Sequence, residues 1–578
     1  LNLTAFGLLA FAVGLFIVHG AIGLATEQRR TGIRTLRALG VPLRAVLGAL
    51  ALELAVIAVL AGAAGLILGY LIAGLLMPGV AGTLQGLYGA DVPGTLRFSP
   101  TWAALAGGMT LAGAAMAGAQ AFARIAAMPL LQPAQPRAWA VASGRGMARQ
   151  GLAALALGLV ALAILGLGDG LVAGFAFLAA LLLASAIALP VVLSWLLGRI
   201  SRLSWGVRAE WMLADARQQM PSLSLALMAL LLALAANIGV STMVGSFRVT
   251  FIGWLDQRLA AEIYVTTASP AEAEAARRYL ETRAGAILPN VWAETDLFGR
   301  PADIYGIVDH PTYRDHWPLL SATPDVWDAV ARGTGALVNE QTARRETLSL
   351  GDPLPIAPEF TLPVVGIYSD YGNPNGQAII ALDLFRALYP EVEILRFGLR
   401  VPPDQVDAVT AGLREEVGLP VDAVVNQAQV KAFSIGVFER TFQITGALNV
   451  LTLAVAGFAI WTSLLTLANM RLPQVAPVWA QGMTRRVLAR MELGRAVLLA
   501  GLTFLLSVPV GLALAWALLA VVNVEAFGWR LPMRLFPGDW LGLLGLALLA
   551  ALTAAAFPAR RLARLGPDRL LRVFANDR

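Results

Sequence analysis

Nine long apolar runs dominate the chain and constrain its fold more than any other feature. A helix needs about 20 apolar residues to cross the ≈ 30 Å hydrocarbon core of a bilayer, and each run approaches or exceeds that length. The runs are 3–24, 45–76, 101–124, 151–168, 171–197, 222–245, 442–468, 487–522 and 539–557. The two longest have room for an interfacial segment before the true span. The sequence therefore predicts a polytopic α-helical membrane protein with about nine spans.

Composition agrees with a membrane protein and excludes several kinds of site. Only 14% of the residues are charged, against about 25% in an ordinary soluble domain. The chain has no cysteine, which excludes disulfides, thiolate metal sites and cysteine nucleophiles. The net charge is +6, but the arginines lie beside the apolar runs rather than in one patch. We therefore expect no binding of nucleic acid.

Arginine placement predicts the orientation of the spans, because positive charge near spans favours the cytoplasmic side. The arginine-bearing connections are 27–44, 124–149, 199–217, 471–490 and 560–578. The connections between them are 77–100, 168–170, 246–440 and 523–538. A single orientation puts the first set inside and the second set outside. We expect a bacterial cytoplasmic (inner) membrane protein whose N-terminus lies outside and whose C-terminus is cytoplasmic.

Residues 246–440 form the one large polar region, which this orientation places outside the membrane. Strand-like stretches at 263–266, 362–368 and 394–400 alternate with helical stretches. The helical stretches are 270–283 and 403–417, and the stretch 368–376 consists of turn residues. The region is long enough for its own core. We expect an α+β extracytoplasmic domain with two subdomains.

An internal repeat relates the last third of the chain to the first fifth. The matched pairs are Phe98 with Phe536, Trp102 with Trp540 and Pro129 with Pro567 at one constant offset, and Gly40 with Gly482 at nearly the same offset. Each copy contains a span, an arginine-rich cytoplasmic stretch, a long apolar run, a short outer loop, another span and an arginine-containing tail. Repeated halves are common in membrane transporters, whose pathway lies between them.

Three segments carry a resemblance to a known family. Residues 27–40 read EQRRTGIRTLRALG, and residues 557–571 read FPARRLARLGPDRLL. These two stretches and the elbow and span at 211–248 resemble the FtsX-like permeases of ABC transporters, in the ten-span type with two modules. The resemblance implies that each module has one span, a large external domain and then three spans. The first span and first external domain are then expected to precede Leu1.

The resemblance divides the chain into five parts. They are 1–130 (last three spans of the first module), 131–204 (cytoplasmic linker and two intermodule spans), 205–245 (elbow and first span of the second module), 246–440 (extracytoplasmic α+β domain) and 441–578 (last three spans of the second module).

The resemblance also implies a cytoplasmic coupling helix that contacts an ATPase. Its residues are Arg29, Arg30, Ile33, Arg34, Leu36, Arg37 and Gly40. The corresponding region of the second module contains Arg471, Gly482, Arg485 and Arg486. Ile33, Leu36 and Leu39 make an apolar stripe at helical spacing, which would suit a groove on an ATPase. The alternative is that this stretch only anchors the chain beside anionic lipid.

Two departures from the family pattern concern these coupling regions. Gly32 occupies a position that is usually acidic in the family, and the second copy contains Pro473 and Pro477. Because proline disrupts helix interiors, we expect the second contact to be weaker or differently shaped.

The chain lacks the motif that ATP hydrolysis requires in P-loop proteins. That motif needs a lysine after a glycine-rich loop, and the single lysine, Lys431, has no such loop before it. We therefore expect no catalytic residues, metal site or cofactor here, with ATP and magnesium bound by a partner. The expected partners are two copies of an ABC ATPase, membrane lipid and, as a further option, a periplasmic protein.

A few polar residues in or near the spans allow two interpretations. Glu53 is either a proton or substrate site or, as we favour, an interfacial acid near headgroups or paired with arginine. His19 in a span is either functional, as polar residues there usually are, or, as we favour, packed at an interface. His310 and His316 lack the further ligands that a metal site needs.

The predicted function is that of an ABC permease subunit that extracts or exports a hydrophobic, lipid-like or lipid-linked substrate by mechanotransmission. One alternative is a signalling subunit that activates an external cell-wall hydrolase. The other is an ion-coupled carrier, which would require several buried charges near the midplane of the membrane. The predicted spans offer almost none.

Overall fold

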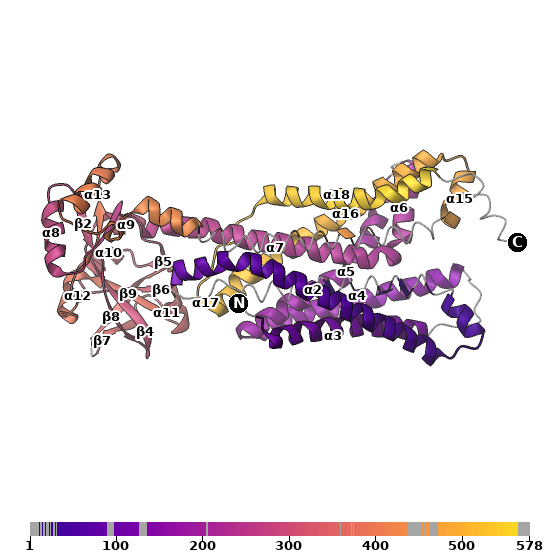
Figure 1. Ribbon diagram of the computed structural model, residues 1–578, viewed down its shortest axis with the longest axis horizontal. Helices are drawn as coiled ribbons and strands as arrows, with labels where there is room; N and C mark the ends of the chain where they lie inside the picture. Colours follow the sequence, from indigo (N-terminus) through magenta and orange to yellow (C-terminus); the bar gives the residue numbers. More distant parts are fainter. Residues whose placement is uncertain are drawn as a thin grey trace. The chain divides into compact units, whose positions relative to one another are not determined.

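The computed structural model describes residues 32–88, 98–126, 136–203, 206–436 and 472–564, apart from 359, 372 and 374, with isolated positions at 11–29 and 439–461 (Figure 1). The chain divides into two compact units. The first comprises Leu1–Val244, Thr441–Leu518 and Arg534–Arg578, and the second comprises Gly245–Arg440 and Leu519–Met533.

Seven helices in the described residues are long and apolar enough to cross a membrane. They are α2 (Leu43–Tyr88), α3 (Pro100–Ala126), α4 (Pro136–Leu167), α5 (Gly170–Ile200), α7 (Met220–Arg258), α16 (Arg485–Ala517) and α18 (Pro537–Arg564). They account for seven of the nine predicted spans, and the runs 3–24 and 442–468 lie largely outside the described residues. The predicted class, a polytopic helical protein with one α+β domain, is confirmed.

Helices α7 and α16 pack closely against each other in the first unit. In the apolar window of α7, 94% of the residues are buried. A Cβ on Gly239 of α7 would lie 2.5 Å from Leu514, and one on Gly511 of α16 would lie 2.7 Å from Ile238. The two glycines therefore let these helices approach closely, as small residues do between membrane helices. The elbow helix α6 (Val207–Gln218) packs on both α5 and α16.

The second unit contains a four-stranded antiparallel sheet in the order β11-β1-β10-β2. Its strands are β1 (Ile263–Thr266), β2 (Ala286–Pro289), β10 (Arg396–Arg400) and β11 (Val424–Asn426). Helices α8 (Pro270–Leu280) and α13 (Val406–Glu415) share a buried core with this sheet. Short 3-10 turns, η1 (Pro403–Gln405) and η2 (Val421–Ala423), flank α13.

The larger sheet has seven strands in the order β3-β4-β9-β6-β8-β5, with β7 paired to β8. Its strands are β3 (Val291–Leu297), β4 (Arg300–Ile307), β5 (Leu319–Ala322), β6 (Ala336–Asn339), β7 (Pro353–Ala357), β8 (Phe360–Tyr368) and β9 (Gly376–Ala381). Phe298 and Gly299 join β3 to β4 with φ of 55° and 76°, the positive values that a tight two-residue hairpin turn requires. The two sheets confirm the two expected subdomains.

Short helices complete the second unit. They are α9 (Pro311–His316), α10 (Val326–Ala331), α11 (Glu340–Arg345), α12 (Leu382–Leu388) and, after the π-helical turn η3 (Leu518–Val522), α17 (Asn523–Phe527). The strands predicted at 263–266, 362–368 and 394–400 are confirmed as β1, β8 and β10.

Candidate functional site

The first predicted coupling region is a short helix that ends in a glycine turn. Residues 32–38 are helical, and Gly40 has a φ of +95°. The Gly40 N–H donates to the carbonyl of Arg37 at 3.1 Å, and the next helix, α2, begins at Leu43. A left-handed glycine is a common way to end a helix, because it has no Cβ to strain.

The second coupling region repeats this geometry. Helix α15 (Leu472–Ala480) is followed by Gly482 with a φ of +100°. The Gly482 N–H donates to the carbonyl of Trp479 at 3.0 Å, and α16 begins at Arg485. Both glycines and both helix starts differ by the same offset, since 482 − 40 and 485 − 43 each equal 442. The internal repeat is therefore present in the backbone.

The prolines of the second copy do not prevent a helix. Pro473 is the second residue of α15, where its missing N–H has no helical partner to lose. Pro477 lies inside the nine-residue helix, which nevertheless continues to Ala480. The prediction that the second contact is weaker or differently shaped stays a prediction.

The apolar stripe of the first coupling region divides between two environments. Ile33 is 5% exposed and packs in a core cluster with Val46 and Ile125. Leu36 and Leu39 are 46% and 77% exposed. Ile33 therefore holds the short helix to the helical unit, whereas the two leucines are available to a partner.

The arginines of the two regions lie in several settings. Arg34 and Arg37 are half-buried, Arg485 and Arg486 form the first residues of α16, and Arg30 and Arg471 lie outside the described residues. Arg29 makes a bidentate pair with Glu53, with nitrogen–oxygen distances of 2.5 and 2.8 Å. The structure therefore agrees with the arginine-paired interpretation of Glu53. His19 lies outside the described residues.

A buried charge cluster joins the elbow helix α6 to α16. The Arg495 side chain is 2% exposed, and its guanidinium lies 3.0 Å from Asp215 Oδ2. The same guanidinium donates to the Gln219 side chain and to Glu492. Two carboxylates and an amide thus contact one buried cation and offset the cost of burying it.

This cluster was missed by the sequence reasoning, which expected almost no buried charge in the spans. The available signal was a glutamate and an arginine three residues apart, at 492 and 495, near the start of an apolar run. Charged residues at that spacing share one helix face and rarely face lipid without partners.

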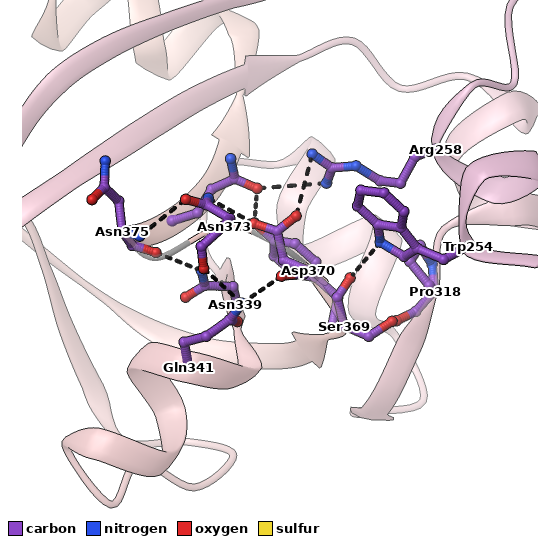
Figure 2. A network of polar contacts seen from close by, with 11 residues as sticks. Trp254, Arg258, Pro318, Asn339, Gln341, Ser369, Asp370, Asn373 and Asn375 are labelled. Carbon is purple, nitrogen blue, oxygen red and sulfur yellow. Dashed lines mark hydrogen bonds and ion pairs between the residues drawn. The ribbon is translucent and has the colours of Figure 1, made fainter. Parts of the chain in front are cut away.

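The last turns of α7 are anchored within the second unit (Figure 2). Trp254 Nε1 donates to the carbonyl of Ser369 at 3.2 Å. Arg258 lies 3.7 Å from the buried carboxylate of Asp370, and its guanidinium carbon is 4.6 Å from the centre of the Trp317 ring. The end of α7 is therefore held by ionic, hydrogen-bond and cation–π contacts.

A polar network fixes the turn between β8 and β9 that receives this helix end (Figure 2). Asn373 donates to Asp370 Oδ2 at 2.8 Å and accepts from the Asn375 N–H at 3.0 Å. From α11 and the residue before it, Asn339 donates to the Asn375 carbonyl and Gln341 to the Asn373 carbonyl, at 3.0 and 3.1 Å. The turn chemistry predicted at 368–376 is confirmed, and its role in holding α7 was not predicted.

A second segment, Leu519–Met533, attaches to the same part of the domain. The Arg530 N–H donates to Glu340 Oε1 at 3.1 Å, and the rings of Trp529 and Tyr371 meet edge to face at 6.3 Å. Asn523 donates to the Trp529 carbonyl at 2.7 Å and fixes the bend. Both the helix that enters the domain and the segment that follows α16 therefore contact residues 369–371.

Of the two histidines considered as metal ligands in the sequence, His310 has a structural role. His310 precedes α9 and accepts the Thr312 N–H at 3.2 Å, so its ring caps the helix. His316 is the last residue of α9.

Comparison with known proteins identifies the repeated modules. The family model for the FtsX-like permease C-terminal region matches residues 4–130 and 446–567. The uncharacterized ABC transporter permease protein Rv0987 of Mycobacterium tuberculosis is 27% identical over 604 residues, covering 98% of this chain and 69% of that protein.

Two solved structures are similar at 12% identity. The periplasmic region of MacB from Actinobacillus actinomycetemcomitans gives a TM-score of 0.23, over 30% of this chain and 91% of that one. The extracellular domain of the noncanonic ABC-type transporter YknZ from Gram-positive bacteria gives 0.22, over 29% and 98%.

The family match falls on both copies of the repeat, and the similarity to an ABC permease extends over nearly the whole chain. Such permeases are multi-pass membrane proteins that leave ATP hydrolysis to a partner ATPase subunit. Both copies of the repeat therefore match the FtsX-like permease family model, and the findings support an ABC transporter permease subunit.

Proposed function

We propose that this permease conveys motion driven by a partner ATPase to its external domain, which then extracts or exports a hydrophobic, lipid-like or lipid-linked substrate. The observation that carries the proposal is the single helix α7. It spans 39 residues, Met220–Arg258, and passes from the first unit into the second. Its last turns are anchored by Trp254 and Arg258.

The length of α7 suits the transmission of motion. At 1.5 Å per residue it is about 58 Å long, roughly twice the ≈ 30 Å hydrocarbon core. A continuous helix transmits a tilt or shift along its length without a flexible loop to absorb it. The close packing of Gly239 and Gly511 ties the membrane part of α7 to α16, which starts at the second coupling turn.

The cytoplasmic side of the proposal rests on the two glycine turns. Their equal geometry favours two equivalent docking points and hence two ATPase copies. The exposed side chains of Leu36 and Leu39 give the first turn an apolar surface for docking. This arrangement requires both turns and the C-terminus to be cytoplasmic, in the bacterial inner membrane.

The lipid-like nature of the substrate is supported by the character of the described spans. Apolar side chains such as Leu52, Val59 and Ile67 lie exposed along α2. The buried cation of Arg495 is satisfied by carboxylates of its own chain. Such spans favour substrate handling at the outer membrane face over passage of a polar solute through the spans.

Photo-crosslinking of the permease–ATPase complex in nanodiscs tests the proposal. A photoreactive amino acid is placed at Val249, 39% exposed on the domain part of α7, or at Asn237, which is 2% exposed within the span. Leu152, 69% exposed on α4, serves as the lipid-facing control. We expect a photoreactive diacyl lipid to be captured at Val249 in an ATP-dependent manner and at Leu152 with or without ATP.

Two outcomes of the same experiment would contradict the proposal. Regular capture of lipid at Asn237 during ATP turnover would show a route through the helix core. Capture at Val249 that ignores ATP would separate the domain from ATP-driven motion.

A further inference from the structure

A cavity of ≈ 370 Å³ lies within the second unit, between its two sheets and the end of α7. This volume is at the lower end of the range for ligand sites, about 300–1,000 Å³. Its walls come from strands of both sheets, from α9 and from the last turn of α7. Six aromatic side chains line it: Trp254, Tyr264, Trp292, Tyr305, Tyr313 and Trp317.

Hydrogen-bond donors dominate the polar groups of this aromatic cavity. Arg258 is the one charged side chain among its lining residues. Its contacts with Asp370 and Gln377, at 3.7 and 3.5 Å, are long, so the five-donor guanidinium retains capacity for another acceptor. Within the part of the chain that the structure describes, the Nε1 of Trp317 is buried and has no hydrogen-bond partner.

The phenols of the cavity stay neutral near physiological pH. Burial raises the pKa of Tyr264, Tyr305 and Tyr313 to about 12. Their hydroxyl groups therefore remain protonated, and Arg258, which is paired with Asp370 behind the lining, is the cationic group at the wall.

We propose that this aromatic cavity binds a compact ligand with one or more planar rings and a carboxylate or similar oxygen anion. The rings of the ligand would stack on the aromatic walls, and its oxygens would accept from Arg258 and Trp317. Because Trp254 and Arg258 belong to the last turns of α7, the bound ligand would also stabilise the contacts that hold this end of α7 in the second unit. The inference does not depend on the identity of the transported substrate.

The test uses the full chain in nanodiscs and three probes of equal ring size. They are 2-naphthoate, the cation 2-naphthylmethylammonium and the neutral 2-naphthalenemethanol, with binding followed by saturation-transfer NMR and empty nanodiscs as the background. We expect saturable binding of 2-naphthoate and at least about tenfold weaker binding of the cation, because only the anion pairs with Arg258.

Three variants locate the bound probe. Trp317→Phe removes the unpaired N–H and is expected to weaken naphthoate binding about fivefold. Leu259→Trp enlarges a lining side chain and should abolish binding. Trp327→Phe makes the same tryptophan change on α10, outside the cavity lining, and should bind like the unmodified chain. Melting temperatures confirm that each variant is folded.

Three results would contradict the proposal. One is the absence of saturable naphthoate binding above empty nanodiscs by the folded, unmodified chain. Another is equal binding by the unmodified chain and the folded Leu259→Trp variant, which would put the probe elsewhere. The third is equal affinity for the naphthyl cation, which would overturn the assigned preference for anions.

Discussion

The two repeats place a charged residue at the same helical position and use it in opposite ways. Glu53 and Arg495 each lie ten residues after the start of their helix, since 53 − 43 and 495 − 485 both equal 10. Glu53 is 44% exposed and pairs with Arg29, whereas Arg495 is 2% exposed and pairs with Asp215 and Glu492. The same backbone arrangement thus carries the exposed pair of Arg29 and Glu53 (the surface pair) in one repeat. In the other repeat it carries the buried charge cluster of Arg495, Asp215 and Glu492, which we call the buried lock.

Helices α2 and α16, which carry Glu53 and Arg495, also differ in how deeply they are buried. In the apolar window of α2 6% of the residues are buried, against 44% for α16. Among the described helices, α16 packs on α5, α6, α7 and α18, and α2 packs on α3. The buried lock is therefore found in the repeat whose helix is the more buried of the two.

Breaking the buried lock should have the largest effect. Arg495→Ala would leave Asp215 and Glu492 buried without their cation, and loss of one partner from such a cluster costs about 3–5 kcal/mol. We expect a large fall in the melting temperature of the detergent-solubilised permease. Adding Asp215→Asn and Glu492→Gln to the same chain should restore much of it. A melting curve for Arg495→Ala like that of the unmodified chain would show that the lock does not stabilise the protein.

Substitutions at the tips of the two coupling turns should differ in their effect on binding of the ATPase. Leu39, 77% exposed, corresponds to Gln481 in the second turn, since 481 − 442 = 39. If Leu39 docks in an apolar groove, Leu39→Asp should reduce co-purification of the ATPase about tenfold, because a charge would be buried in the contact. Gln481→Asp should have a smaller effect.

The matched control for Leu39→Asp is Val421→Asp, which changes a 71% exposed residue of the external domain. It should leave ATPase recovery unchanged. Undiminished recovery with Leu39→Asp would favour the lipid-anchor interpretation of this stretch.

Alanine at the two turn glycines tests whether the repeats share one geometry. Gly40 and Gly482 have φ of +95° and +100°, so each alanine should destabilise by about 1 kcal/mol through backbone strain. Gly32→Ala is the control, because Gly32 is helical and a Cβ there meets nothing within 4 Å. It should be neutral or slightly stabilising. Markedly unequal losses at the two turns, measured by thermal unfolding, would argue against equivalent turns.

Much of the fold could be predicted because its causes are local. Apolar run length predicted the described spans, and alternation and turn residues predicted β1, β8 and the turn at 368–376. The repeat located Gly40 and Gly482, whose positive φ then matched. These features depend on residues close together in the sequence.

The rest depends on contacts between distant residues. Arg495 meets Asp215 from 280 positions away, and no local pattern names that partner. Helical spacing put Ile33 with Leu36 and Leu39 on one stripe, but packing against Val46 and Ile125 buries only the first. The attachment of Leu519–Met533 through Trp529 and Arg530 likewise required the folded domain.

The smallest effect on the melting temperature is expected for the surface pair of Arg29 and Glu53. Because Glu53 and Arg29 are about half exposed, water and salt screen their attraction, and exposed pairs contribute little. Glu53→Gln should leave the melting temperature close to that of the unmodified chain at any salt concentration. A loss as large as that of Arg495→Ala would show that the two positions are equally important.

The central claim is that ATP-driven motion reaches the external domain. The chain has no cysteine, so two introduced cysteines can carry spin labels without background labelling. Suitable positions are Arg278 on α8, whose side chain is 70% exposed, and Leu167 at the end of α4, which is 87% exposed. Pulsed electron resonance on the permease–ATPase complex would measure the distance distribution between them. The account predicts one distribution without nucleotide and a shifted one when ATP is trapped, with return after hydrolysis. Identical distributions in all states of a complex that still hydrolyses ATP would contradict it.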